Sequence, residues 1–162
     1  RLENNTGSGV NSAGGGIQVS GLATIQDSLI SGNSVYDGAG VKNEGTLTLV
    51  NTSIVSNTAV YSGGGILNTD SGHVSVERST IGDNQAGPQG YEAEGGGIAN
   101  RGAMTLTYTS VISNTATTRG GGIANFGRLT MAYGDILGNS AGHYGGGVYN
   151  GGELDLAGLL ST

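Results

Sequence analysis

The sequence contains no cysteine, so neither a disulfide framework nor a thiolate metal site can stabilise the fold. Only six residues are Lys or Arg, against twelve Asp and Glu, and the net charge of −6 argues against binding to the phosphate backbone of nucleic acids. No apolar run approaches the roughly 20 residues that a membrane-spanning helix needs. We therefore predict a protein with no nucleic-acid partner and no membrane span, held together by packing and hydrogen bonds.

Proline is also scarce, with one residue, whereas glycine accounts for 34 of the 162 residues. The glycines are not spaced every third residue, which excludes a collagen helix. They gather in six clusters, each closed by an aliphatic residue, and successive clusters lie 24 or 25 residues apart with one gap of 32. These closing residues are Ile17, Val41, Ile66, Ile98, Ile123 and Val148. So regular a period predicts stacked repeats that share one core.

Each repeat also contains a short segment in which apolar and polar residues alternate. The segments are 22–25, 46–49, 73–76, 103–106, 128–131 and 153–156. Alternation with a period of two indicates a strand with one buried face. Eight residues after five of these segments comes an Asn, at Asn33, Asn57, Asn84, Asn114 and Asn139. A second Asn column follows the glycine clusters at Asn43, Asn68, Asn100, Asn125 and Asn150, with Val19 as its exception.

The two Asn columns predict two ordered corners at which amide side chains bond from one repeat to the next. We predict an all-β fold, a parallel β-helix of about six coils of 24–25 residues, with three short strands and three turns in each coil. Right-handedness follows from the general preference of parallel crossovers. Residues 1–162 form a single solenoid segment, which we interpret as part of a longer chain. Leucine-rich repeats need a helical segment, and calcium-binding β-rolls need an Asp after the glycines; neither signal is present.

The pattern GGGI-x-N-x-G-x-L-T-L-x-x-S-x-I-x-x-N-x-A can be followed, with small departures, through residues 120–141 and 63–86. It resembles the repeats of right-handed parallel β-helix proteins of bacterial surfaces, including polymorphic outer membrane protein repeats and the pectin-lyase-like group. The resemblance implies secretion or a cell-surface location, in a bacterium, with a structural or adhesive role.

Pectin-lyase-like enzymes would imply a calcium-binding group of Asp residues with a basic residue nearby. Calcium takes six to eight oxygen ligands, but Asp27, Asp83 and Asp135 fall in different columns or beside uncharged neighbours. His73 and His143 also lie in different parts of the coil. We therefore predict no enzymatic activity, metal or cofactor, and keep a polysaccharide lyase or hydrolase as the alternative. Ice binding is a third hypothesis, based on a hydroxyl column at Thr24, Thr48, Ser75, Thr105 and Thr130.

The one long interval contains an inserted segment, residues 86–94, which we expect to project from a corner as a binding loop. Inserted loops on a repeat scaffold commonly carry function. Its candidate contacts are Tyr91, Glu92 and Glu94. The partner we expect there is a surface polysaccharide or a host protein.

A second candidate surface is an outward apolar stripe comprising Tyr108, Ile112, Tyr133 and Leu137. Contiguous exposed apolar patches commonly mark interaction sites. We expect copies of the protein itself, or the rest of a longer chain, to cover it. Together these features predict an extracellular structural or adhesive β-solenoid that can assemble end to end into a fibre or stalk.

Overall fold

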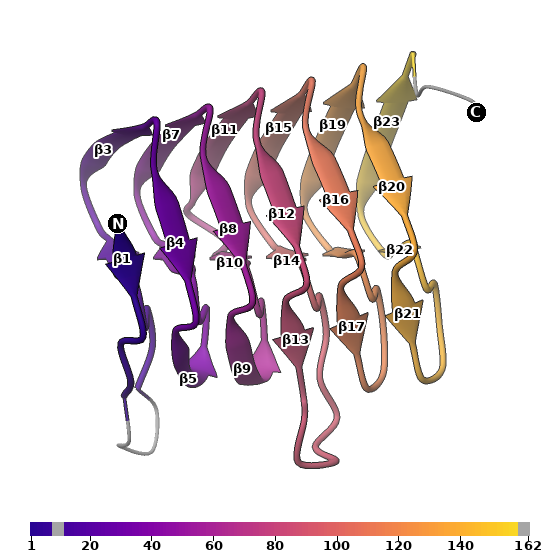
Figure 1. Ribbon diagram of the computed structural model, residues 1–162. Coiled ribbons are helices and arrows are strands. Elements are labelled where there is room, and N and C mark those ends of the chain that lie inside the picture. The colour runs from indigo at the N-terminus through magenta and orange to yellow at the C-terminus, as the bar shows by residue number, and fades with distance from the viewer. Residues whose placement is uncertain (8–11, 159–162) are drawn as a thin grey trace.

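The computed structural model describes residues 1–7 and 12–158 and shows a parallel β-solenoid of about six coils (Figure 1). Strands occupy the same place in every coil and pair in parallel with the coils on either side, so the chain advances by one rung per repeat. The predicted all-β solenoid is confirmed. No helix long and apolar enough to cross a membrane occurs among the described residues.

The strands form four sheets, which we number I to IV in their order along a coil. Sheet I contains β2 (Ile17–Val19), β6 (Val41–Asn43), β10 (Ile66–Asn68), β14 (Ile98–Asn100), β18 (Ile123–Asn125) and β22 (Val148–Asn150). Sheet II contains the longest regular strands, β3 (Leu22–Gln26), β7 (Thr46–Val50), β11 (His73–Glu77), β15 (Ala103–Thr107), β19 (Arg128–Ala132) and β23 (Glu153–Ala157).

Sheet III contains β1 (Leu2–Glu3), β4 (Leu29–Ser31), β8 (Ser53–Val55), β12 (Thr80–Gly82), β16 (Ser110–Ile112) and β20 (Asp135–Leu137). Sheet IV contains β5 (Ser34–Asp37), β9 (Thr58–Ser62), β13 (Gln85–Ala86), β17 (Thr115–Ala116) and β21 (Ser140–Ala141).

The prediction of three strands per coil is wrong, because sheet IV supplies a fourth. Its last three strands are only two residues long; β13 and β17 each bury one alanine, Ala86 or Ala116, and Ala141 of β21 is half-buried. Strands this short cannot show a period of two, so the sequence carries no alternation signal for a fourth strand. They count as a sheet because they pair in register with neighbouring coils, as Ala59 pairs with Ala86.

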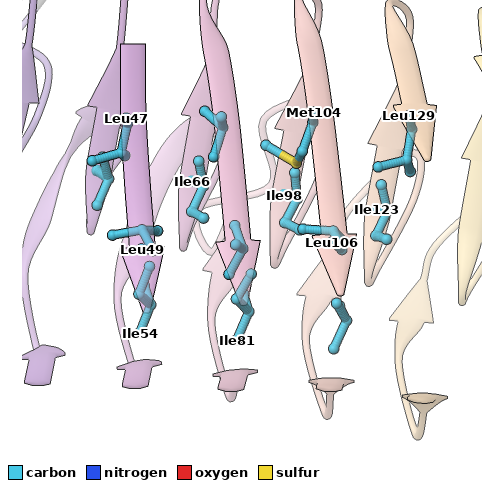
Figure 2. Packing of buried hydrophobic residues seen from close by; sticks show 14 of the residues in the cluster. Leu47, Leu49, Ile54, Ile66, Ile81, Ile98, Met104, Leu106, Ile123 and Leu129 are labelled. Carbon is cyan, nitrogen blue, oxygen red and sulfur yellow. The ribbon is translucent and has the colours of Figure 1, made fainter. Parts of the chain in front are cut away.

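The core is a stack of aliphatic columns that runs through the middle of the solenoid (Figure 2). Alternate residues of sheet II point inward, so Leu47 and Leu49 are fully buried whereas Thr46 is exposed. Ile123 is 0% exposed and lies between Ile98 and Val148 in sheet I. This arrangement confirms the predicted stacking register.

Three corners of each coil contain a residue with positive φ, and these residues form columns. The corner between sheets II and III has φ of 47–56° at Asp27, Asn51, Arg78, Tyr108 and Tyr133. At the corner where each glycine cluster begins, every residue with positive φ is a glycine: Gly14, Gly38, Gly63, Gly95, Gly120 and Gly145. A Cβ on Gly63 would lie 2.6 Å from the Ile66 carbonyl oxygen, so the corner has room only for glycine.

Both predicted asparagine columns form side-chain ladders. Ladder A lies between sheets III and IV and contains Asn5, Asn33, Asn57, Asn84, Asn114 and Asn139. Asn5 is a member that the sequence did not predict. Ladder B follows sheet I and contains Asn43, Asn68, Asn100, Asn125 and Asn150. Within ladder A, each Oδ1 also accepts the backbone N–H of the preceding Asn, as Asn84 does from Asn57 at 3.0 Å.

Ladder B stops at Asn43 because Val19 occupies the equivalent position on the preceding coil, and the valine side chain has no hydrogen-bond donor. The Asn43 Oδ1 atom is consequently buried without a hydrogen-bond partner among the described residues. The Asn43 Nδ2 atom still donates to Asn68 Oδ1 at 2.9 Å and to the Gly45 carbonyl at 3.0 Å. The Val19 exception therefore leaves an unsatisfied acceptor in the native structure.

Candidate functional site

The outer surface of the solenoid carries the candidate sites, because the interior is filled by aliphatic side chains. Tyr108 and Tyr133 stand at the corner between sheets II and III on successive coils. Their rings stack with centroids 5.2 Å apart and an interplanar angle of 16°. The side chains are 57% and 53% exposed. The structure thus brings these two predicted residues together.

Ile112 and Leu137 pair with each other at the ends of β16 and β20, at the opposite end of the sheet III strands from the tyrosine corner. Ile112 is half-buried and Leu137 is 50% exposed. The four residues of the predicted stripe therefore occupy two columns, one at each end of sheet III, on adjacent coils.

The inserted segment projects below β13 and reaches beyond the loops of the coils beside it (Figure 1). Its two ends belong to the coil: Ala86 lies in β13, and both Ala86 and Ala93 are buried against Ala116. Tyr91 and Glu92 are exposed, and the Tyr91 ring contacts that of Tyr61 at a centroid distance of 5.3 Å. The Thr117 hydroxyl donates a hydrogen bond to the Tyr91 carbonyl and ties the loop to the next coil.

Glu94 lies apart from the two exposed loop residues, because it forms bridges in the coil with Ser62 and Arg119. Its carboxylate is 3.1 Å from the Arg119 guanidinium and 3.6 Å from that of Arg101. Its side chain is 21% exposed. Glu94 therefore anchors the end of the insertion to the coil.

The two arginines also lie over aromatic rings, which sequence reasoning missed. Arg119 is 5.3 Å from the Tyr149 ring centroid, and Arg101 is 5.6 Å from that of Phe126. The two rings contact each other at 5.7 Å. We call Glu94, Arg101, Arg119, Phe126 and Tyr149 the arginine–aromatic cluster. Glu94 and Arg119 are bridge partners in one column, and Arg101 and Phe126 each follow a ladder B asparagine on successive coils. The residue types in these columns differ from coil to coil, so the columns do not stand out as a repeat.

A groove of about 600 Å³ follows the outer face of sheet II. Outward side chains of β7 to β23 line it, and hydroxyl groups run along its middle at Thr48, Ser75, Thr105 and Thr130. His73 and Arg128 interrupt the neighbouring column, and Arg128 pairs with Glu153 at 3.1 Å. The groove therefore combines a file of hydroxyls with charged groups at its C-terminal end.

Two carboxylates near sheet I have shifted pKa values. Burial raises the pKa of Asp37, and this effect outweighs the Ser62 N–H hydrogen bond and the positive charges of Arg101 and Lys42. The exposed Glu44 has its pKa lowered by the hydrogen bond from Lys42, 2.7 Å away, and by Gln18. Asp37 is therefore the carboxyl whose ionisation opposes folding.

Among residues 1–7 and 12–158, no group of three or more His, Asp or Glu side chains is placed to hold a metal ion. His73 lies on sheet II, whereas His143 contacts Tyr144 at a separate corner with ring centroids 6.1 Å apart. Comparisons with protein-family models, with curated proteins and with solved structures found no match.

Proposed function

We propose that this chain is an extracellular structural or adhesive segment, a straight β-solenoid that displays variable side chains on a constant core. The observation that carries the proposal is the continuity of its hydrogen bonding. Sheets I, II and III each have six parallel strands in register, and the two asparagine ladders run beside them from coil to coil. The secreted, bacterial-surface setting is proposed from the resemblance of the repeat.

This architecture suits a rigid spacer because the inner coils pair with both neighbouring coils in all four sheets. The glycine clusters allow successive coils to approach closely. A Cβ on Gly65 would lie 2.6 Å from the Gly97 carbonyl oxygen of the next coil, which is too close for any side chain. Outward residues of sheet II differ between coils, as His73, Ala103 and Arg128 do at one register position. Such a rod can present binding surfaces at fixed spacing.

End-to-end assembly is the second element of the proposal. In the last coil, Leu154 is half-buried and Leu156 is 40% exposed. On earlier coils, Leu49 and Leu106 occupy the same column as Leu156 and are fully buried. A further coil stacked here would cover the apolar side chains and pair with β23, because a free strand edge is a template for pairing. That coil is either a continuation of the chain or another copy, and copies stacked head to tail form a filament.

The test uses the 162-residue chain at increasing concentration. We expect light scattering and sedimentation to show growing species, and electron microscopy to show rods that lengthen without widening. Leu156→Lys places a charge on the apolar end and should suppress this growth, whereas Thr105→Lys on the outer face of a middle coil should not. A monomer that persists at high concentration contradicts end-to-end assembly and leaves the structural role to a longer chain.

The sheet II groove favours a second function, a polysaccharide lyase or hydrolase. An extended groove of about 600 Å³ with hydroxyl groups along its middle has the form of a site for a linear sugar chain. The side chains of His73, Glu153 and Asp155 are candidates for proton transfer there, and the Arg128 guanidinium supplies a positive charge. Incubation with polygalacturonate and calcium, followed by product analysis, tests this alternative. Cleavage that Arg128→Ala abolishes would favour the enzyme over the structural role.

A further inference from the structure

Three tyrosine rings from successive coils form a row along the solenoid, on the side of sheet IV. Tyr36 comes from β5, Tyr61 from β9 and Tyr91 from the inserted loop. Ring centroids are 5.8 Å apart between Tyr36 and Tyr61 and 5.3 Å apart between Tyr61 and Tyr91. We call these residues the tyrosine row. It lies at a different corner from the Tyr108–Tyr133 stack.

The insertion supplies the third ring of the row. Glu94 pairs with Ser62, so the coil residue that follows Tyr61 in the column is Ala93. Ala93 is buried and carries no ring. The loop returns Tyr91 to this place, where the Thr117 hydroxyl holds its carbonyl. The row would end at Tyr61 without the insertion, so the loop has the effect of lengthening an aromatic surface.

A bulge in β9 accompanies the middle ring. Val35 pairs with Ala59 and Asp37 pairs with Ser62, so two residues of β9, including Tyr61, stand opposite Tyr36 alone. Bulges redirect side chains at functional sites. Tyr61 and Tyr91 remain 38% and 46% exposed, so their contact with each other leaves ring surface free for a ligand.

We propose that the tyrosine row binds a neutral polysaccharide, with its hexose rings stacked along the solenoid axis. The ring spacing of 5.3–5.8 Å is close to the length of one hexose unit in an extended chain, so successive sugars meet successive coils. Sugar C–H groups pack on the negative faces of aromatic rings, and phenolic hydroxyls exchange hydrogen bonds with sugar hydroxyls.

The negative charges near the row favour neutral sugars over anionic uronic acids. The exposed Glu92 follows Tyr91 at one end of the row, whereas the Asp37 carboxyl after Tyr36 accepts the Ser62 N–H. The Glu92 carboxylate can accept hydrogen bonds from sugar hydroxyls, but it repels uronic acids, in a chain whose net charge is −6. The inference rests on the adhesive part of the proposed function and is independent of end-to-end assembly.

Binding can be measured with cellohexaose, laminarihexaose and mannohexaose, using hexagalacturonate as the anionic comparison. The chain has seven tyrosines and no tryptophan, so tyrosine fluorescence can follow binding, and comparison with the tyrosine variants assigns the signal to the row; calorimetry is the second readout. We expect at least one neutral hexasaccharide to bind and hexagalacturonate not to bind. Tyr61→Ala and Tyr91→Ala should each weaken binding about three- to tenfold, as expected for loss of one aromatic contact.

Tyr91→Phe keeps the ring and should retain most of the affinity, which separates stacking from misfolding of the loop. Tyr108→Ala removes an equally exposed tyrosine at another corner and should leave binding unchanged. The inference is overturned if no neutral hexasaccharide binds, if hexagalacturonate binds more tightly, or if Tyr108→Ala weakens binding as much as Tyr91→Ala. Sedimentation of the same variants separates this result from the assembly test, because the row is distant from Leu156 in the fold.

Discussion

Replacement of one asparagine in each ladder tests how the corners stabilise the solenoid. We choose Asn84→Leu in ladder A and Asn100→Leu in ladder B, because both side chains are almost fully buried and leucine has a similar size. The two changes remove amides with similar numbers of hydrogen bonds, but they leave different neighbours unpaired. Ladder A should be the more sensitive of the two.

In ladder A, Asn84 Oδ1 accepts hydrogen bonds from the Asn57 backbone N–H and Nδ2, and its own Nδ2 donates to the Ile54 carbonyl at 2.9 Å. After the substitution, Asn57 Nδ2 keeps the carbonyls of Ile30 and Val55, but the Asn57 N–H has no acceptor. A buried donor without a partner costs about 1–3 kcal/mol, and the other lost bonds raise the expected total to about 2–4 kcal/mol.

In ladder B, the loss of Asn100 leaves Asn68 Nδ2 with the carbonyls of Gly72 and Ala103. The atoms that lose a donor are all acceptors, namely Asn125 Oδ1 and the carbonyl oxygens of Gly102 and Arg128. The native structure already contains one such unsatisfied oxygen at Asn43. We therefore expect a smaller cost of about 1–2 kcal/mol for Asn100→Leu.

Thermal unfolding followed by circular dichroism measures the difference. For a chain of this size, about 1 kcal/mol corresponds to about 2–4 °C in Tm. Asn84→Leu should therefore lower Tm by about 4–16 °C, and Asn100→Leu by about half as much. Urea unfolding of the same variants checks that the transition remains cooperative. An Asn100 variant that is as unstable as the Asn84 variant would refute the argument that the backbone N–H sets the cost.

Four further changes test other features. Ile123→Ala should cost about 2–5 kcal/mol because it opens a cavity between the fully buried Ile98 and the half-buried Val148, and an unchanged Tm would contradict the stacking register. Val19→Asn should supply the missing donor to Asn43 Oδ1, so urea unfolding should find it more stable by about 1 kcal/mol than Val19→Leu, which has a similar size and no donor; equal stability would argue against the unsatisfied acceptor. Asp37→Asn should stabilise the fold most near neutral pH. Because the Asp37 pKa is raised in the folded state, the folded wild-type protein binds this proton more tightly than the unfolded chain does. The wild-type protein therefore gains stability as the pH falls toward the ordinary pKa of Asp. Urea unfolding at several pH values should show that the stability difference between Asp37→Asn and wild type becomes smaller at low pH. Deletion of 88–92 should leave the circular dichroism spectrum unchanged, because the coil closes through Ala86 and Ala93, whereas loss of the β signal would show that the loop is needed for folding.

The sequence by itself determined the features that repeat within every coil. Alternation in sheet II decides which side chains are buried, because a strand points successive residues to opposite faces. The all-glycine corner beginning at Gly14 and the two asparagine ladders follow from identical residues at a fixed interval, since each member meets the same residue one coil away. Even the Val19 exception, visible as a break in a column, predicts where a ladder must stop.

Only the tertiary structure decided the features in which coils differ. Sheet IV emerges from two-residue strands that are defined by their partners in adjacent coils, so no local period reveals them. The placement of Tyr91 beside Tyr61 depends on how an irregular loop folds back, and Glu94 joins two arginines from separate coils. These contacts are made by outward side chains, and the alternation that orders the core places no constraint on them. Their partners are therefore set by the three-dimensional path of the chain.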